Sequence, residues 1–99
     1  MNIGKMMKDL QKMQAKMQED LEVLEVEGTS GGGVVTARMN GKKELLAINL
    51  SPEAITPDDT EMMEDLLVAA VNEAGRKVDE EVQRMTQGLT AGMKIPGLF

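Results

Sequence analysis

The sequence contains no cysteine, histidine, tryptophan or tyrosine, and Phe99 is its only aromatic residue. The absence of cysteine excludes disulfides and thiolate chemistry. The absence of histidine leaves the only two serines, Ser30 and Ser51, without an imidazole that could activate them as nucleophiles. The scarcity of aromatic rings argues against stacking on the bases of single-stranded nucleic acid. We therefore expect neither an enzyme nor a bound cofactor.

Long apolar segments and metal-ligand spacings are missing as well. The longest apolar run, 66–71, is far shorter than the roughly 18 residues of a membrane-spanning helix. The N-terminus alternates lysine with methionine and lacks the apolar stretch of a secretory signal, so we expect a cytoplasmic protein without membrane contact. The acidic residues around Asp58 lack the spacing of a calcium loop. Gly31-Gly32-Gly33 precede a strand-like run, which favours a tight turn over a phosphate-binding loop.

Methionine, in contrast, is abundant. The chain has 99 residues, enough for one domain, and ten of them are methionine. Methionine fills irregular gaps in a core but specifies packing poorly. A short chain with few large rigid side chains gains stability by burying surface against a second copy. The composition therefore favours an oligomer.

Charge is distributed unevenly along the chain. The formal net charge is −6. Residues 1–18 nevertheless carry four lysines and a single acid, Asp9, whereas residues 19–27 carry five acids and no base. Most of the remaining acids follow residue 52. The chain thus combines a basic N-terminal segment with an acidic body, and this distribution of charge is more informative than the net charge.

The N-terminal segment has the periodicity of a helix over residues 3–22. Apolar residues recur at spacings of three and four, which places them on one stripe: Ile3, Met6, Leu10, Met13, Met17 and Leu21. At about 100° per residue, the four lysines fall within an arc of roughly 80°, away from this stripe. The predicted helix therefore has one apolar edge and one basic edge.

The period then changes to two, which predicts three short strands. The predicted strands are 23–28, 34–39 and 45–50, with Val35, Ala37 and Met39 on one face of the second and Leu46, Ile48 and Leu50 on one face of the third. Asn40-Gly41 is a strong hairpin signal, in which Gly41 is expected to adopt a positive φ. Tight turns between consecutive strands predict an antiparallel meander.

A second helix is predicted over residues 58–87. Ser51-Pro52-Glu53 is expected to form a single helical turn after the sheet. Thr56 is predicted to cap the long helix, with Pro57 at its first position, and Gly88 to end it. The expected order is therefore α-β-β-β-α, an α+β fold with a three-stranded antiparallel sheet in a single domain over 1–90. We expect a flexible C-terminal tail at 91–99.

The basic edge of the first helix is the main functional candidate. Lys5, Lys8, Lys12 and Lys16 could simply keep an exposed face soluble, but such faces usually mix charges of both signs. A basic edge in an acidic protein favours nucleic acid. Only three arginines are available for guanine contacts, so phosphates would dominate binding. A second reading is a protein-interaction module that uses the methionine stripe of the same helix.

In the order of its sequence segments, the chain resembles the YbaB/EbfC family of bacterial nucleoid-associated proteins. The resemblance covers nearly the whole chain, and it is the combination that is specific. It rests on the N-terminal segment MMKDLQKMQAKMQEDLEVLEVEGTSGGG, the strand–turn–strand that ends in Asn40-Gly41, Ile48-Asn49-Leu50 before Ser51-Pro52, the long acidic helix, and the tail Met93-Lys94-Ile95-Pro96-Gly97-Leu98-Phe99.

The resemblance implies a tweezer-shaped homodimer that binds double-stranded DNA in the nucleoid. It also implies recombination or repair proteins as candidate partners, because genes of the family often neighbour theirs. DNA contacts in the family are placed on the terminal helices. The basic positions that match here are Lys5, Lys8, Lys12 and Lys16 on the first helix, and Arg76, Lys77 and Arg84 on the last. Asp79-Glu80-Glu81 lie between the cations of the last helix and make it more acidic than a DNA surface should be.

Overall fold

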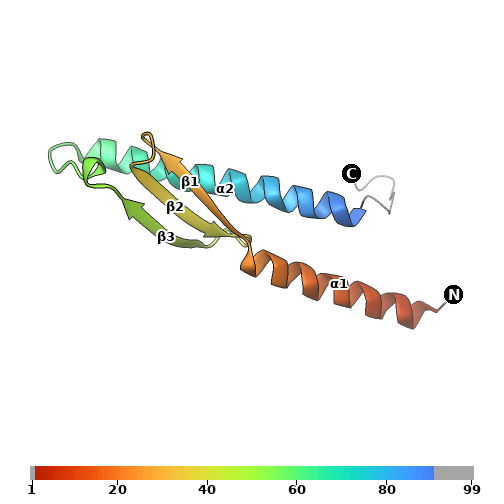
Figure 1. Ribbon diagram of the computed structural model, residues 1–99. Helices are drawn as coiled ribbons and strands as arrows, with labels where there is room; N and C mark the ends of the chain where they lie inside the picture. Colours follow the sequence, from red (N-terminus) through yellow and green to blue (C-terminus); the bar gives the residue numbers. More distant parts are fainter. Residues whose placement is uncertain (1, 91–99) are drawn as a thin grey trace.

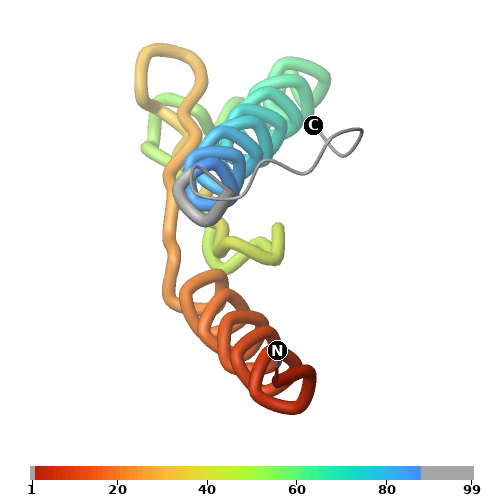
Figure 2. The backbone as a smooth tube through the Cα atoms, turned by 90° about the vertical axis from the view of Figure 1, so that its right-hand side faces the viewer, coloured from red at the N-terminus to blue at the C-terminus, as the bar shows by residue number. Residues whose placement is uncertain are grey.

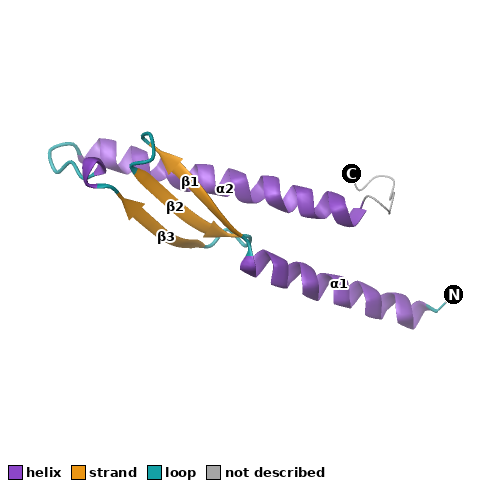
Figure 3. Cartoon of the chain, viewed as in Figure 1, coloured by secondary structure: helices purple, strands orange, loops and turns teal. Residues whose placement is uncertain are grey.

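The computed structural model describes residues 2–90 and confirms the predicted α-β-β-β-α order (Figures 1 and 3). Its elements are α1 (Ile3–Val23), β1 (Glu25–Ser30), β2 (Val35–Asn40), β3 (Leu45–Leu50), the short 3₁₀ helix η1 (Pro52–Ala54) and α2 (Thr60–Thr90). The single turn expected after the sheet is η1. The tail predicted at 91–99 lies outside the described residues.

The three strands form one antiparallel sheet in the order β1-β2-β3. Gly28 of β1 pairs with Ala37 of β2, which pairs in turn with Ile48 of β3. The register between β2 and β3 shifts at Arg38 and Met39. The central strand therefore receives neighbours on both sides, and its alternating apolar residues face a single direction.

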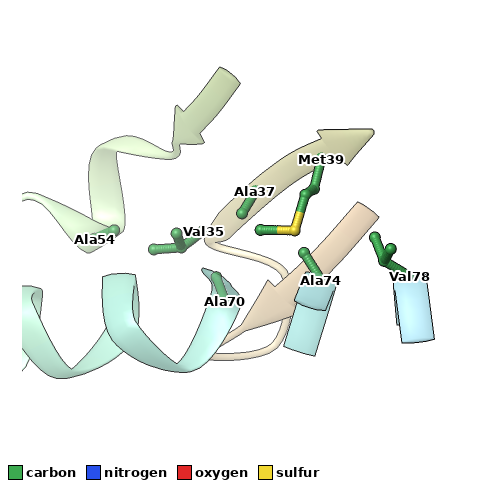
Figure 4. Packing of buried hydrophobic residues seen from close by; sticks show 7 residues of the cluster. All are labelled: Val35, Ala37, Met39, Ala54, Ala70, Ala74 and Val78. Atoms are coloured by element: carbon green, nitrogen blue, oxygen red, sulfur yellow. The ribbon is translucent and has the colours of Figure 1, made fainter. Parts of the chain in front are cut away.

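The core lies between this sheet and α2. Val35, Ala37 and Met39 of β2 face Ala70, Ala74 and Val78 of α2 (Figure 4) and, together with Ala54, all are at most 5% exposed. The face of β2 that was predicted to carry Val35, Ala37 and Met39 is thus the one buried against α2. Because most of these side chains are small, the helix and the sheet lie close together.

The apolar side chains of β3 are largely uncovered. Leu46, Ile48 and Leu50 are each about two-fifths exposed, at 44%, 38% and 42%. The reason is geometric: α2 packs on β1 and β2, and a helix about 10 Å wide spans two strands spaced about 4.8 Å apart. The third strand therefore keeps an apolar face open.

The first helix extends beyond this body. No residue of α1 is buried, and α1 and the C-terminal half of α2 point toward the same end of the molecule (Figures 1 and 2). The Cα radius of gyration is 18.8 Å, whereas a compact domain of this length has about 13 Å. The molecule is elongated because α1 projects from the sheet as an arm.

The base of α1 is fixed to the loop between β2 and β3, and here the expected turn geometry is wrong. The Gly41 amide donates to the Leu21 carbonyl at 2.9 Å. The residue with positive φ in this loop is Lys43, at 62°, and not Gly41. The buried Asn40 side chain accepts hydrogen bonds from the Lys42 and Glu44 amides. The loop is thus longer than a two-residue turn.

Gly41 is nevertheless indispensable for a different reason. A Cβ at this position would lie 2.5 Å from the Leu21 carbonyl oxygen and 2.8 Å from its Cα. Gly41→Val is therefore expected to lower the free energy of unfolding by about 2–4 kcal/mol, because the backbone of α1 would have to move away. Thermal denaturation followed by circular dichroism measures this loss. A midpoint equal to the parent's would contradict the contact.

The two ends of α2 also differ from expectation. Pro57 and Asp58 form a turn, and α2 begins at Thr60. The cap is Asp59, whose Oδ1 accepts from the Met62 amide at 3.1 Å, and not Thr56. At the other end, α2 continues through Gly88 to Thr90. A glycine ends a helix only where the backbone turns left-handed, and at Gly88 it stays helical.

Candidate nucleic-acid interface

The predicted basic edge lies on the exposed face of the projecting helix. The helix begins at Asn2, whose side chain accepts from the Lys5 amide at 3.1 Å. All four lysines of the edge are exposed. Within residues 2–90, no carboxylate forms an ion pair with Lys5, Lys8, Lys12 or Lys16. Their charges are therefore available to an external anion.

The charges of α1 run against the preference of the helix dipole. Acids are favoured in the first turn of a helix and bases in the last turn. The first turn of α1 contains no acid and its last turn no base. Lys5 occupies the positive end of the dipole, while Asp20 and Glu22 occupy the negative end. Helix stability does not explain this order, which points to another purpose.

The opposite edge of α1 is apolar and open. Ile3 is 69% exposed, and Met6, Leu10 and Met13 follow along the same stripe. Toward the base of the helix, Met13 and Met17 approach Met85 of α2 and line an open depression of about 200 Å³ with Lys16 and Asp20. The two predicted edges of α1 thus coexist, one of them basic and the other apolar.

The cations of β2 and of the loop between β2 and β3, in contrast, have carboxylate partners. Lys42 pairs with Glu22 at 2.8 Å and Lys43 with Asp79 at 2.9 Å. The hydrogen bond that the Lys42 ammonium donates to Glu22 raises the pKa of Lys42, so this lysine stays charged at neutral pH. Arg38 lies 3.8 Å from Glu25. These three cations fasten elements to one another, and none was predicted to bind DNA.

The three candidates on α2 do not share one environment. Arg76 is exposed and has no ion-pair partner within the described residues. Lys77 donates to the Glu27 carbonyl of β1 at 2.7 Å and lies 3.7 Å from Glu73. Arg84 pairs with Glu81. Two of the three candidates are therefore engaged within the chain, which weakens α2 as an anion-binding surface.

Two further classes of site are absent from the described part of the chain. Among these residues, no group of three or more acidic side chains is placed to hold a metal ion. No helix there has the length and apolarity that crossing a membrane requires.

Fold and surface together define the class: a small α+β protein with two long terminal helices, one of which carries an unpaired basic edge. The chain belongs to the YbaB/EbfC DNA-binding family, whose model matches residues 1–93. The resemblance stated from the sequence is thereby confirmed.

Known relatives agree with this assignment. The chain is 47% identical to a nucleoid-associated protein of Clostridium novyi, over 100% of this chain and 90% of that protein. It is 50% identical to a nucleoid-associated protein of Caldanaerobacter subterraneus subsp. tengcongensis, over 99% and 91% of the two chains. Its fold is similar to the crystal structure of an uncharacterized protein from Helicobacter pylori, with a TM-score of 0.76, 23% identity and coverage of 90% and 97%.

Proposed function

We propose that this protein binds double-stranded DNA through its phosphates, as a homodimer in the nucleoid, with no catalytic step. The observation that carries the proposal is the basic edge: four exposed lysines on one arc of a projecting helix, none paired with a carboxylate of the described chain. Unpaired lysines bind phosphate as point charges and read no base sequence. Membership of a DNA-binding family and the names of the relatives support the same ligand.

Salt dependence tests the proposed ligand. If roughly four to six phosphates are neutralised, log K should fall with log salt at a slope of about −4 to −5. Raising monovalent salt from 50 to 200 mM should then weaken binding to a random duplex by roughly several hundredfold. A gel-shift titration at several salt concentrations measures this slope. Binding that ignores salt, or no binding at all, would contradict the proposal.

A second candidate function rests on the apolar edge of α1. Exposed methionines adapt to many partner surfaces, so this edge could hold a helix of another protein while the lysines only solubilise it. Such docking would depend little on salt, in contrast to phosphate binding. The same titration therefore separates the two functions, provided that duplex and partner are both assayed.

The proposed homodimer is supported by apolar surface that a single chain leaves open. Leu46, Ile48 and Leu50 form an uncovered face on β3, which is also an edge strand of the sheet. Contiguous apolar patches of this kind mark contacts between proteins. Light scattering at micromolar concentration should return about twice the chain mass of 10.8 kDa. A mass of one chain would contradict the dimer.

The face of β3 used in the dimer can be tested by a matched pair of substitutions. Ile48→Asp places a charge on the open apolar face and is expected to raise the dimer dissociation constant by about tenfold or more. Asn49→Asp adds the same charge on the opposite face of the same strand and should leave the dimer unchanged. Sedimentation over a concentration series compares the two variants. Equal effects would show that this face is not the contact.

A further inference from the structure

The charge on α1 is divided along the axis of the helix as well as around it. The four lysines occupy positions 5–16 with a single acid, Asp9, among them, and the last two turns carry the acids Glu19, Asp20 and Glu22. We call these three residues the acidic base, because they lie where α1 joins the body. Of the three, only Glu22 has an ion-pair partner among residues 2–90, so Glu19 and Asp20 keep uncompensated charges.

The helix dipole has the same direction as this division. Its positive end lies at the tip, beside Lys5, and its negative end lies at the acidic base. Despite Asp9, the net charge of the side chains and the backbone dipole therefore have the same direction, attractive to phosphate at the tip of α1 and repulsive at the acidic base. Since both charge groups oppose the dipole preference of the helix, the gradient is maintained at a cost in helix stability.

We infer that the acidic base confines a bound duplex to the outer part of α1 and keeps it away from the sheet. This inference rests on the proposed DNA binding. From Lys5 to Lys16 the helix rises roughly 17 Å, which corresponds to about five base-pair steps of 3.4 Å. Each arm thus contacts a short stretch of backbone. The acidic base then limits how far the duplex extends along α1 toward the sheet.

Lys16 stands at the boundary between the two charge groups. It precedes Glu19 by three residues and Asp20 by four, the spacings at which helical side chains are neighbours. Lys16 and Asp20 also line the same depression. The field that Lys16 presents to a phosphate is therefore partly cancelled, whereas Lys8 lies about two turns closer to the tip. The four lysines are consequently unequal in their contribution to binding.

The first experiment neutralises Glu19 and Asp20, the two members of the acidic base without an ion-pair partner among residues 2–90, in the 99-residue chain. In the double variant Glu19→Gln, Asp20→Asn, affinity for a random duplex at 0.1 M salt is expected to rise on the order of fourfold, because two repulsive charges within about one Debye length are removed. The matched control is Glu64→Gln, Asp65→Asn, the same chemical change on exposed residues near the start of α2. Glu64 lies roughly 30 Å along α2 from Met85, about three Debye lengths, so the control should change affinity by less than about 1.5-fold.

A double-mutant cycle gives the second readout. In the parent chain, Lys16→Gln should weaken binding by less than half the factor by which Lys8→Gln weakens it. Once Glu19 and Asp20 are neutralised, the two lysine substitutions should weaken binding by similar factors. If neutralising Glu19 and Asp20 raised duplex affinity no more than neutralising Glu64 and Asp65, the inference would be overturned, since net charge alone would then explain both effects. So would equal losses from Lys8→Gln and Lys16→Gln in the parent. A parent chain that binds no duplex would instead overturn the proposed function itself.

Discussion

Replacing Gly28 by alanine is expected to lower the free energy of unfolding by about 3 kcal/mol or more, a large fraction of the roughly 5–15 kcal/mol that stabilises a small domain. A Cβ at this position would lie 2.3 Å from the Ala70 carbonyl oxygen and 2.3 Å from the Ala74 amide nitrogen. Both atoms belong to the backbone of α2, so no side-chain rotation relieves the overlap. The helix would have to lift off β1, and Ala70 and Ala74 would lose their burial.

The matched control for Gly28→Ala is the same change at Gly75. Apart from its chain neighbours and the adjacent backbone of α2, no heavy atom of the described residues lies within 4 Å of a Cβ at Gly75, which is in the interior of α2. Gly75→Ala should therefore stabilise the protein by about 0.5–1 kcal/mol, because alanine favours the helix. Urea denaturation of the two variants should move the midpoint in opposite directions. If Gly28→Ala matched the parent, the close packing of α2 on β1 would be wrong.

The order of elements was predictable from the sequence because each element has a clear period. The spacing of Ile3, Met6 and Leu10 is helical, and that of Val35, Ala37 and Met39 is typical of a strand, so the type of each element and the residues that share its apolar face followed directly. The period does not reveal how many strands one helix can cover. The exposure of β3 depends on the width of α2, a property of the assembled layers.

Local signals failed where a tertiary contact decides the structure. Asn40-Gly41 indicated a two-residue turn, yet the glycine is required by the approach of Leu21, about twenty residues earlier in the chain. Thr56 and Pro57 had the residue types of a helix start. Asp59 is an equally good cap three residues later, and it is the one that accepts from the first turn of α2.

The candidate site was predictable only in part, because helical geometry is local whereas ion pairing depends on contacts between elements. The arc of lysines follows from helical geometry alone, and the helix it requires is present. Ion pairing of the other cations depends on contacts such as Lys43 with Asp79, which are 36 residues apart in the sequence. The engagement of Lys77 with the Glu27 carbonyl is likewise a contact between elements. Only the structure separates available cations from engaged ones.

The double charge reversal Lys8→Glu, Lys12→Glu is expected to have the largest effect on function. Both side chains are exposed and leave the apolar edge of α1 untouched, so the fold and the dimer should survive. In a dimer, the change removes four cations and adds four anions on the two arms. At 0.1 M salt, affinity for duplex should fall on the order of a hundredfold on every sequence tested, and the salt slope should flatten to about −2.

The matched control is the double variant Arg76→Glu, Arg84→Glu on α2, which changes the net charge by the same amount. Arg84 already pairs with Glu81, and Asp79 and Glu80 lie close to both arginines in the sequence, so little phosphate affinity is available to lose there. We expect a loss of less than about fivefold for this variant. Gel shifts at matched salt, with circular dichroism and light scattering as checks on fold and mass, distinguish the two helices. Equal losses would mean that net charge, and not the basic edge of α1, governs binding. If the α1 variant kept the parent's affinity, its lysines would serve only solubility, and the apolar edge beside them would become the functional surface.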